Sequence, residues 1–210
     1  MAFHKSIELK PNTKAYFWKI DEEYNSLFRS VILKDISLTR LEQMKSESHQ
    51  KGFLAVRMLL QHLGYNDYDL HYDEYGKPHL KDGQHISISH SNGFSCIAIS
   101  DQNIGIDLEI LKEKTLKIAP RYMDVKHLEN LSIKDKLIKA TIVWGIKECV
   151  FKVKNQVGIS FLDHIFEDEF SLADKKAAVQ LHFENKIEHF SIVFDSIEEY
   201  IFVCAFQQLK

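Results

Sequence analysis

The sequence predicts an α+β fold made of two pseudo-duplicated α/β halves, each a long helix packed on a small, mostly antiparallel sheet. The halves are expected at residues 1–102 and 103–210. A long segment with apolar residues at helical spacing precedes alternating strand segments twice, near 49–63 and again near 137–154.

A weak internal echo supports the duplication. His-Ile-Ser-Ile at residues 85–88 resembles His-Phe-Ser-Ile at 189–192, and an apolar strand follows each segment. Chance similarity between two hairpins is the alternative explanation. If the echo is real, the halves should pack as one pseudo-dimeric unit.

The first half should begin with a strand at Ala15–Ile20 and a polar helical stretch from about Asp21. Ser37 is a candidate helix cap because its hydroxyl could accept a hydrogen bond from a free backbone amide. A longer helix is predicted at His49–Leu63, and Gly64 is a natural stop for it.

The rest of the first half should be a loop followed by a hairpin. Gly76 and Pro78 predict a loop over 73–80. Two alternating segments then meet at Asn92-Gly93, a sequence typical of a hairpin turn.

The second half should open with a strand at Ile104–Ile110. A mostly helical stretch is predicted over 116–154, interrupted early by Pro120. Residues 158–188 carry no pattern that assigns an element.

The composition excludes several classes of protein. The net charge of −3 argues against nucleic acid as a partner. No apolar run approaches the ~20 residues that a membrane helix needs, and the first ten residues lack a secretory pattern. The three scattered cysteines are expected to be buried free thiols, so a cytoplasmic location fits best.

Four charged residues form the first candidate site. Asp107 and Glu109 lie two apart on a predicted strand and should point to the same side. Glu148 and Lys152 lie four apart on a predicted helix and should share a face. Each pair alone could be a solvated surface feature. Three carboxylates brought together would repel unless a divalent cation neutralised them, and Mg2+ prefers such oxygen ligands.

Two further patterns bear on chemistry. Arg57 lies between apolar neighbours, so its stem should be buried and its guanidinium should have an anionic partner. Ser89 and His90 are adjacent on a strand and should point to opposite faces, which disfavours a serine–histidine nucleophile.

Taken in order, four motifs resemble those of the Sfp-type 4'-phosphopantetheinyl transferases. These motifs are Tyr75-Gly-Lys-Pro78, Ile86-Ser-Ile-Ser-His-Ser91, Ile104-Gly-Ile-Asp-Leu-Glu109 and Trp144-Gly-Ile-Lys-Glu-Cys-Val-Phe-Lys152. The helix containing Leu-Ala-Val-Arg57 fits a further family pattern. Cys149 departs from the family, where alanine or serine is common, but it is close to them in size.

The resemblance implies a set of coenzyme A-binding residues. Arg57 and His90 would bind phosphates, and Ser89 would join them from the same motif. Gly76, Lys77 and Pro78 would hold the adenine end.

The resemblance also implies the catalytic residues. Asp107, Glu109 and Glu148 would hold Mg2+, and Lys152 would neutralise the pyrophosphate. The proton of the attacking carrier serine would pass to Glu148 or to a metal-bound water.

The implied partners are coenzyme A and an apo acyl or peptidyl carrier protein, and two halves in one chain suggest a monomer. Carrier proteins are acidic, so Lys134, Lys136 and Lys139 are candidate docking residues, or equally a solvated helix face. The main alternative is a non-catalytic coenzyme A- or carrier-binding homologue. A plainer one is an α+β domain whose acidic residues are merely solvated.

Overall fold

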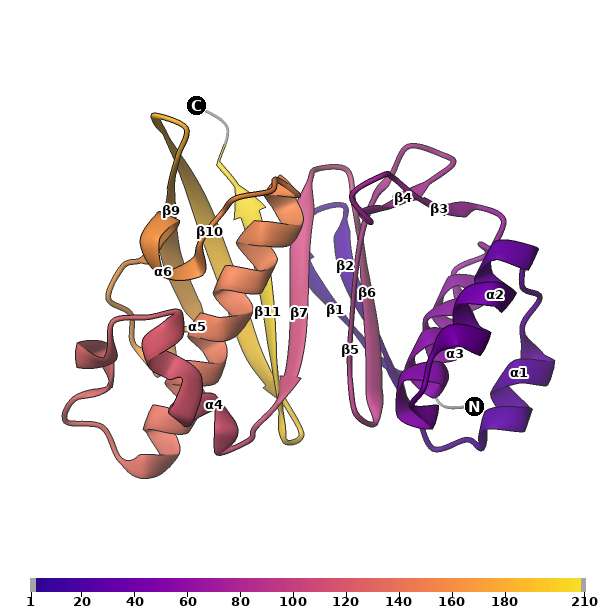
Figure 1. The fold of residues 1–210 in the computed structure, drawn as a ribbon, viewed down its shortest axis with the longest axis horizontal. Coiled ribbons are helices and arrows are strands. Elements are labelled where there is room, and N and C mark those ends of the chain that lie inside the picture. The colour runs from indigo at the N-terminus through magenta and orange to yellow at the C-terminus, as the bar shows by residue number, and fades with distance from the viewer. Residues whose placement is uncertain (1–2, 209–210) are drawn as a thin grey trace. The chain divides into compact units, whose positions relative to one another are not determined.

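A computed structural model describes residues 3–208 of the chain (Figure 1). Its contacts divide the chain into two compact units, Met1–Gln102 and Asn103–Lys210. These bounds coincide with those expected for the two halves. Each unit pairs a long helix with an antiparallel sheet, which confirms the predicted α+β class.

The first unit carries a sheet of order β1-β2-β6-β5-β4-β3 with the helix α3 packed on it. The helices α1 and α2 lie beside α3 (Figure 1). Within residues 3–102 the elements are β1 (Phe3–Lys10), β2 (Thr13–Lys19), α1 (Tyr24–Ser30), α2 (Asp35–Gln43), α3 (Glu47–His62), β3 (Leu70–Tyr72), β4 (Pro78–Leu80), β5 (His85–Ser91) and β6 (Phe94–Ser100).

The second unit carries a sheet of order β7-β11-β10-β9-β8 with the helix α5 packed along it (Figure 1). Short helical turns at Ala119–Arg121, Val125–Leu128 and Leu172–Asp174 connect its elements. Within residues 103–208 these elements are β7 (Ile104–Ile110), α4 (Lys114–Ile118), α5 (Ile133–Lys154), α6 (Phe161–His164), β8 (Ile165–Glu167), β9 (Lys176–Phe183), β10 (Lys186–Ile197) and β11 (Tyr200–Gln207).

The two sheets have the same topology once β1 is set aside. In each unit a first strand (β2 or β7) leads into the long helix, and four strands follow. The spatial orders β2-β6-β5-β4-β3 and β7-β11-β10-β9-β8 then match strand for strand, and the neighbouring strands of both sheets pair antiparallel across residues 3–208. The sequence echo falls on β5 and β10, which occupy equivalent places. The duplication is therefore a property of the fold as well as of the sequence.

Local sequence explains the bounds of α3. Tyr65 N–H donates to Leu60 O at 2.9 Å, and Gly64 N–H donates to Gln61 O at 3.1 Å. This is the Schellman pattern, and Gly64 takes the positive φ of 84° that it requires. The predicted stop at Gly64 is confirmed.

Helix α5 is capped at both ends. Ser132 accepts a hydrogen bond from Asp135 N–H at 3.1 Å, and Asn155 closes the other end in the left-handed conformation. The apolar residues at helical spacing that predicted this helix form a buried stripe, which includes Val143, Ile146, Val150 and Val153. As predicted, Pro120 interrupts the helical stretch before α5, where it lies in a 3-10 turn.

Several sequence predictions were wrong or incomplete. Ser37 does not cap a helix, because α2 already begins at Asp35 and Ser37 is buried in its first turn. The strand β1 was missed. Residues 158–188, which had no assignment, contain α6, β8, all of β9 and the start of β10. Strands as short as β8 lack room for a recognisable alternation.

Within the described residues, none of the helices is both long enough and apolar enough to cross a membrane. The three cysteines, Cys96, Cys149 and Cys204, are free and buried, as predicted.

Candidate functional site

The candidate site of the second unit is built on a close approach between α5 and β7. A Cβ added at Gly105 would lie 2.1 Å from the backbone oxygen of Cys149, and one at Gly145 would lie 2.7 Å from Val203 Cγ2. Only glycine permits such contacts. Gly105 therefore lets the helix lie directly against β7, the strand that carries Asp107, and Gly145 lets it lie against the neighbouring strand β11.

Lys152 links the helix to this strand. Its Nζ donates to Asp107 Oδ1 at 2.9 Å and to the backbone oxygen of Ile106 at 2.8 Å. The Asp107 side chain is 6% exposed and that of Lys152 is 29% exposed. Burial is the largest effect and lowers the pKa of Lys152, but Asp107 and the other neighbouring groups, Glu148 among them, together outweigh it and leave the pKa above its ordinary value. The lysine is therefore a lasting positive charge beside the carboxylates.

Glu148 completes the cluster from one turn earlier on α5. Burial, and after it the negative charge of Asp107, raises the pKa of Glu148 above its ordinary value, while Lys152 opposes the shift. The two carboxylates thus repel each other in the metal-free protein. A divalent cation with oxygen ligands would relieve that repulsion, so this donor set fits Mg2+.

Glu109 follows Asp107 on the same face of β7 and is half-buried. Within residues 3–208, no three His, Cys, Asp or Glu side chains are placed so that they could hold a metal ion as they stand. The metal role of Asp107, Glu109 and Glu148 remains a prediction.

Trp144 packs near this site on α5. Its ring makes edge contacts with Tyr122 and Phe161, with centroids 5.2 and 5.6 Å away. Burial raises the pKa of Tyr122, whose hydroxyl donates to Ala140 O at 3.0 Å. These contacts join the middle of α5 to α6 and to Tyr122, the residue that follows the 3-10 turn Ala119–Arg121.

Sequence reasoning missed a buried charge cluster on the other side of α5. Lys147 is 2% exposed and its Nζ lies 2.5 Å from Glu167 Oε2 on β8. His127 Nδ1 lies 3.3 Å from the other oxygen of Glu167. Lys147 stands inside a quoted motif, but nothing in the sequence signals that a glutamate 20 residues later would meet it.

In the first unit, Arg57 has the anionic partner that its apolar surroundings predicted. Its side chain is 3% exposed, and Nε donates to Asp67 Oδ1 at 3.0 Å. The guanidinium also lies 3.4 Å from the ring centroid of Phe53. Its Nη2 is buried without a hydrogen-bond partner among residues 3–208. The role of Arg57 in phosphate binding remains a prediction.

The Gly-Lys-Pro segment forms a tight loop. Asp73 Oδ1 accepts hydrogen bonds from Tyr75 N–H at 3.0 Å and Lys77 N–H at 2.8 Å. Gly76 takes a positive φ of 85° there, and Pro78 begins β4. The loop predicted for coenzyme A is therefore shaped by its own aspartate.

Ser89 and His90 point to opposite faces of β5, as predicted, since Ser89 is buried and His90 is exposed. A Cβ at Gly52 would lie 3.2 Å from His90 Cγ, so the imidazole packs against α3 at its glycine. His49 is close by, with its ring 6.0 Å from that of His90.

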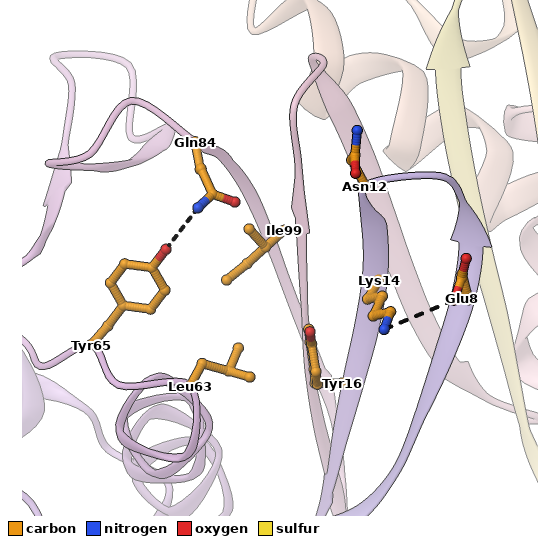
Figure 2. Close-up of a pocket in the computed structure, with 8 residues that line it drawn as sticks. All are labelled: Glu8, Asn12, Lys14, Tyr16, Leu63, Tyr65, Gln84 and Ile99. Atoms are coloured by element: carbon orange, nitrogen blue, oxygen red, sulfur yellow. Dashed lines mark hydrogen bonds and ion pairs between the residues drawn. The ribbon is translucent and has the colours of Figure 1, made fainter.

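A separate hollow of about 430 Å³ lies in the first unit and contains none of the predicted site residues (Figure 2). Tyr65 donates its hydroxyl proton to Asp82 at 2.6 Å and accepts from Gln84 at 3.2 Å. Burial and then the Asp82 hydrogen bond raise the pKa of Tyr65 to about 12. Figure 2 also shows an exposed ion pair between Lys14 and Glu8, 3.8 Å apart.

The candidate docking lysines do not form one exposed surface. Lys139 is 7% exposed and its Nζ donates to Phe170 O at 3.4 Å, which removes it from the prediction. Lys134 is exposed and Lys136 is half-buried.

Fold and site together define an α+β protein of two topologically matching units, with an acidic–lysine cluster between a helix and a strand of the second. No model of a known protein family matches the chain. Three curated proteins are nevertheless similar to it.

The 4'-phosphopantetheinyl transferase Sfp of Bacillus subtilis (strain 168) is 31% identical over 144 residues, which cover 63% of this chain and 64% of that protein. The 4'-phosphopantetheinyl transferase gsp of Aneurinibacillus migulanus is 32% identical over 83 residues, 38% of this chain and 35% of that protein. A further 4'-phosphopantetheinyl transferase of Bacillus subtilis is 30% identical over 141 residues, 63% and 60% of the two chains. The chain thus spans less than two thirds of the length of these relatives. The resemblance to Sfp-type 4'-phosphopantetheinyl transferases is confirmed.

Proposed function

We propose that this protein is an enzyme that transfers the 4'-phosphopantetheine group of coenzyme A to a serine of an apo acyl or peptidyl carrier protein. The observation that carries the proposal is the cluster of Asp107, Glu148 and Lys152, which lies on motifs that resemble those of the 4'-phosphopantetheinyl transferases, and three proteins of that name are similar to this chain. The reaction breaks a P–O bond of the pyrophosphate and forms a new one to the serine oxygen. Adenosine 3',5'-bisphosphate leaves.

The chain's own residues suit this chemistry. Mg2+ held by Asp107, Glu109 and Glu148 would supply charge neutralisation at the pyrophosphate. Lys152 adds a fixed positive charge beside it. Because burial raises the pKa of Glu148, its carboxylate accepts a proton more readily than an ordinary glutamate, which suits a base for the serine hydroxyl.

Coenzyme A binding is assigned to the first unit. Lys77 and the Gly76–Pro78 backbone would hold the adenine end, while His90, Ser89 and Arg57 would serve its phosphates. Support comes from the resemblance and from the loop shape that Asp73 imposes. Arg57 would have to act through its buried Nη2, because Asp67 occupies Nε.

Incubation with coenzyme A, Mg2+ and apo carrier proteins tests the proposal. The expected result is a carrier mass increase equal to one phosphopantetheine group, dependent on Mg2+. The Glu148→Gln variant should abolish it, while Glu188→Gln, which alters a carboxylate elsewhere in the second unit, should not. Coenzyme A binding with no mass increase on any apo carrier would favour the non-catalytic homologue instead.

A further inference from the structure

The buried cluster of Lys147, Glu167 and His127 has no part in the proposed chemistry, yet it lies next to it in sequence. Lys147 directly precedes Glu148 on α5. Consecutive helical residues point about 100° apart. The lysine therefore faces β8 while the glutamate faces the Asp107 side of the helix.

Two lysines fasten α5 to the two edge strands of its sheet. Lys152 reaches Asp107 on β7, and Lys147 reaches Glu167 on β8. These strands stand at opposite ends of the order β7-β11-β10-β9-β8. A helix held at both edges cannot turn about its axis without breaking one ion pair. The direction of Glu148, which lies between the two lysines in sequence, is set by both.

The ion pair between Lys147 and Glu167 is buried. Lys147 Nζ also donates to the backbone oxygen of Ile165 at the start of β8. The Glu167 side chain is 4% exposed, and His127, on the 3-10 helix Val125–Leu128, contacts its second oxygen. One carboxylate thereby joins three segments of the chain around α5.

A buried ion pair is an expensive way to obtain stability. Replacing such a pair with apolar side chains of similar volume is often neutral or stabilising, because the desolvation of both charges is avoided. Burial accordingly lowers the pKa of Lys147, against the attraction of Glu167. What the pair supplies that an apolar contact would not is a single fixed rotation of the helix.

We propose that Lys147 and Glu167, backed by His127, are positioning residues that orient Glu148 toward Asp107 for Mg2+ binding and transfer. This inference rests on the proposed function of the Asp107–Glu148 cluster. Residues that fix the orientation of metal ligands typically change metal affinity or activity by roughly ten- to hundredfold when removed.

The test replaces both charges at once, in the variant Lys147→Met/Glu167→Met, so that neither is left buried alone. Its matched control is Lys154→Met/Glu188→Met. That pair has an N–O distance of 2.7 Å, also joins α5 to the sheet, and is 20% and 26% exposed. Three quantities are measured: the melting temperature without metal, the affinity for Mn2+ as a Mg2+ substitute by calorimetry, and kcat and KM for transfer to an apo carrier.

The positioning variant should melt close to wild type, bind Mn2+ roughly ten- to hundredfold more weakly, and lose kcat rather than carrier KM. The control pair should keep both metal affinity and kcat. Unchanged Mn2+ affinity and kcat in the positioning variant would overturn the inference and leave the proposed function standing. Weakened Mn2+ binding in a protein that transfers nothing would support the inference and refute the proposed function. If wild-type protein binds no Mn2+, both fail.

Discussion

The charge state of Glu148 opposes stability and serves function. Its carboxylate is desolvated and faces Asp107, and both effects raise its pKa. A carboxyl group whose pKa is raised by folding destabilises the fold once the pH exceeds its unfolded pKa. Such a cost is typical of groups placed for chemistry rather than for packing.

Glu148→Gln should therefore raise the melting temperature of the metal-free protein at neutral pH. The difference should shrink as the pH falls and disappear below about 4, where glutamate is protonated in both states. Mg2+ should stabilise the wild type and not the variant. Thermal melts across pH, with and without Mg2+, measure all three effects. A variant less stable than wild type at neutral pH would contradict this account.

The buried ion pair of Arg57 and Asp67 differs from Glu148, because here each charge is needed for the stability of the fold. Asp67 Oδ2 also accepts from Lys34 N–H at 3.0 Å, so one carboxylate ties α3 to the segment before α2. Asp67→Asn leaves the arginine buried without its counter-charge and should cost about 3–5 kcal/mol in the free energy of unfolding, measured by urea titration.

The double variant Arg57→Met/Asp67→Leu should lose much less stability than Asp67→Asn. It also isolates the role of Arg57 in ligand binding. A stable double variant with weakened coenzyme A affinity would support a phosphate contact, whereas wild-type affinity would restrict Arg57 to the ion pair.

At the scale of elements, two glycines set the distance between α5 and its sheet, Gly105 at β7 and Gly145 at β11, and the two meet different obstacles. An added methyl at Gly145 meets the side chain of Val203, and one at Gly105 meets the backbone of Cys149. Side chains can be shortened and backbones cannot. The two positions should therefore respond differently to a second substitution.

Gly145→Ala should destabilise the protein by about 1–3 kcal/mol, and adding Val203→Ala should recover part of that loss. Gly105→Ala should be at least as damaging, and Val203→Ala should not rescue it. Urea unfolding of these four variants and of Val203→Ala alone measures the coupling. If Val203→Ala restored the same stability at both positions, the added methyl groups would act by moving α5 as a whole away from the sheet, and not through the two local clashes.

Element types were predictable where the local pattern is long. The alternation in Ile104–Ile110 placed β7 to the residue, and helical spacing placed most of α3 and α5. Short elements such as β3 and β8 were not predictable, because their positions depend on pairing with distant strands. The pairing of Glu167 with Lys147 was not predictable for the same reason, because strand pairing in the sheet, and not the local sequence, brings the two residues together.

On the scale of the whole chain, matching topology makes β1 the exception. It has no counterpart among the described residues of the second unit, 103–208, and none of its own residues is fully buried. The strand pairs only with β2.

Removal of residues 1–11 should leave the rest of the first unit folded, because β1 is an edge strand and carries no buried core residue. Far-ultraviolet circular dichroism should keep its helical signal, and the melting temperature should fall modestly. Loss of all cooperative unfolding would show that β1 is integral to the first unit.

The duplicated order could be anticipated from the echo between β5 and β10, but the candidate site could be anticipated only in part. Residue spacing paired Asp107 with Glu109 and Glu148 with Lys152, and the family resemblance joined the two pairs. The structure places Glu148 and Lys152 beside Asp107. The sequence predicted that Arg57 has an anionic partner but did not identify Asp67, because Asp67 lies in a loop that carries no periodic signal.

The enclosed thiols have a practical consequence for reporter chemistry. Cys96, Cys149 and Cys204 are all 0% exposed, and burial raises the pKa of Cys149, so little reactive thiolate is present. A maleimide dye should therefore not react with the three native cysteines. It should modify a single cysteine introduced by Ile133→Cys, because Ile133 is 82% exposed at the start of α5. That single fluorophore would report a carrier arriving near the helix without any background label to subtract.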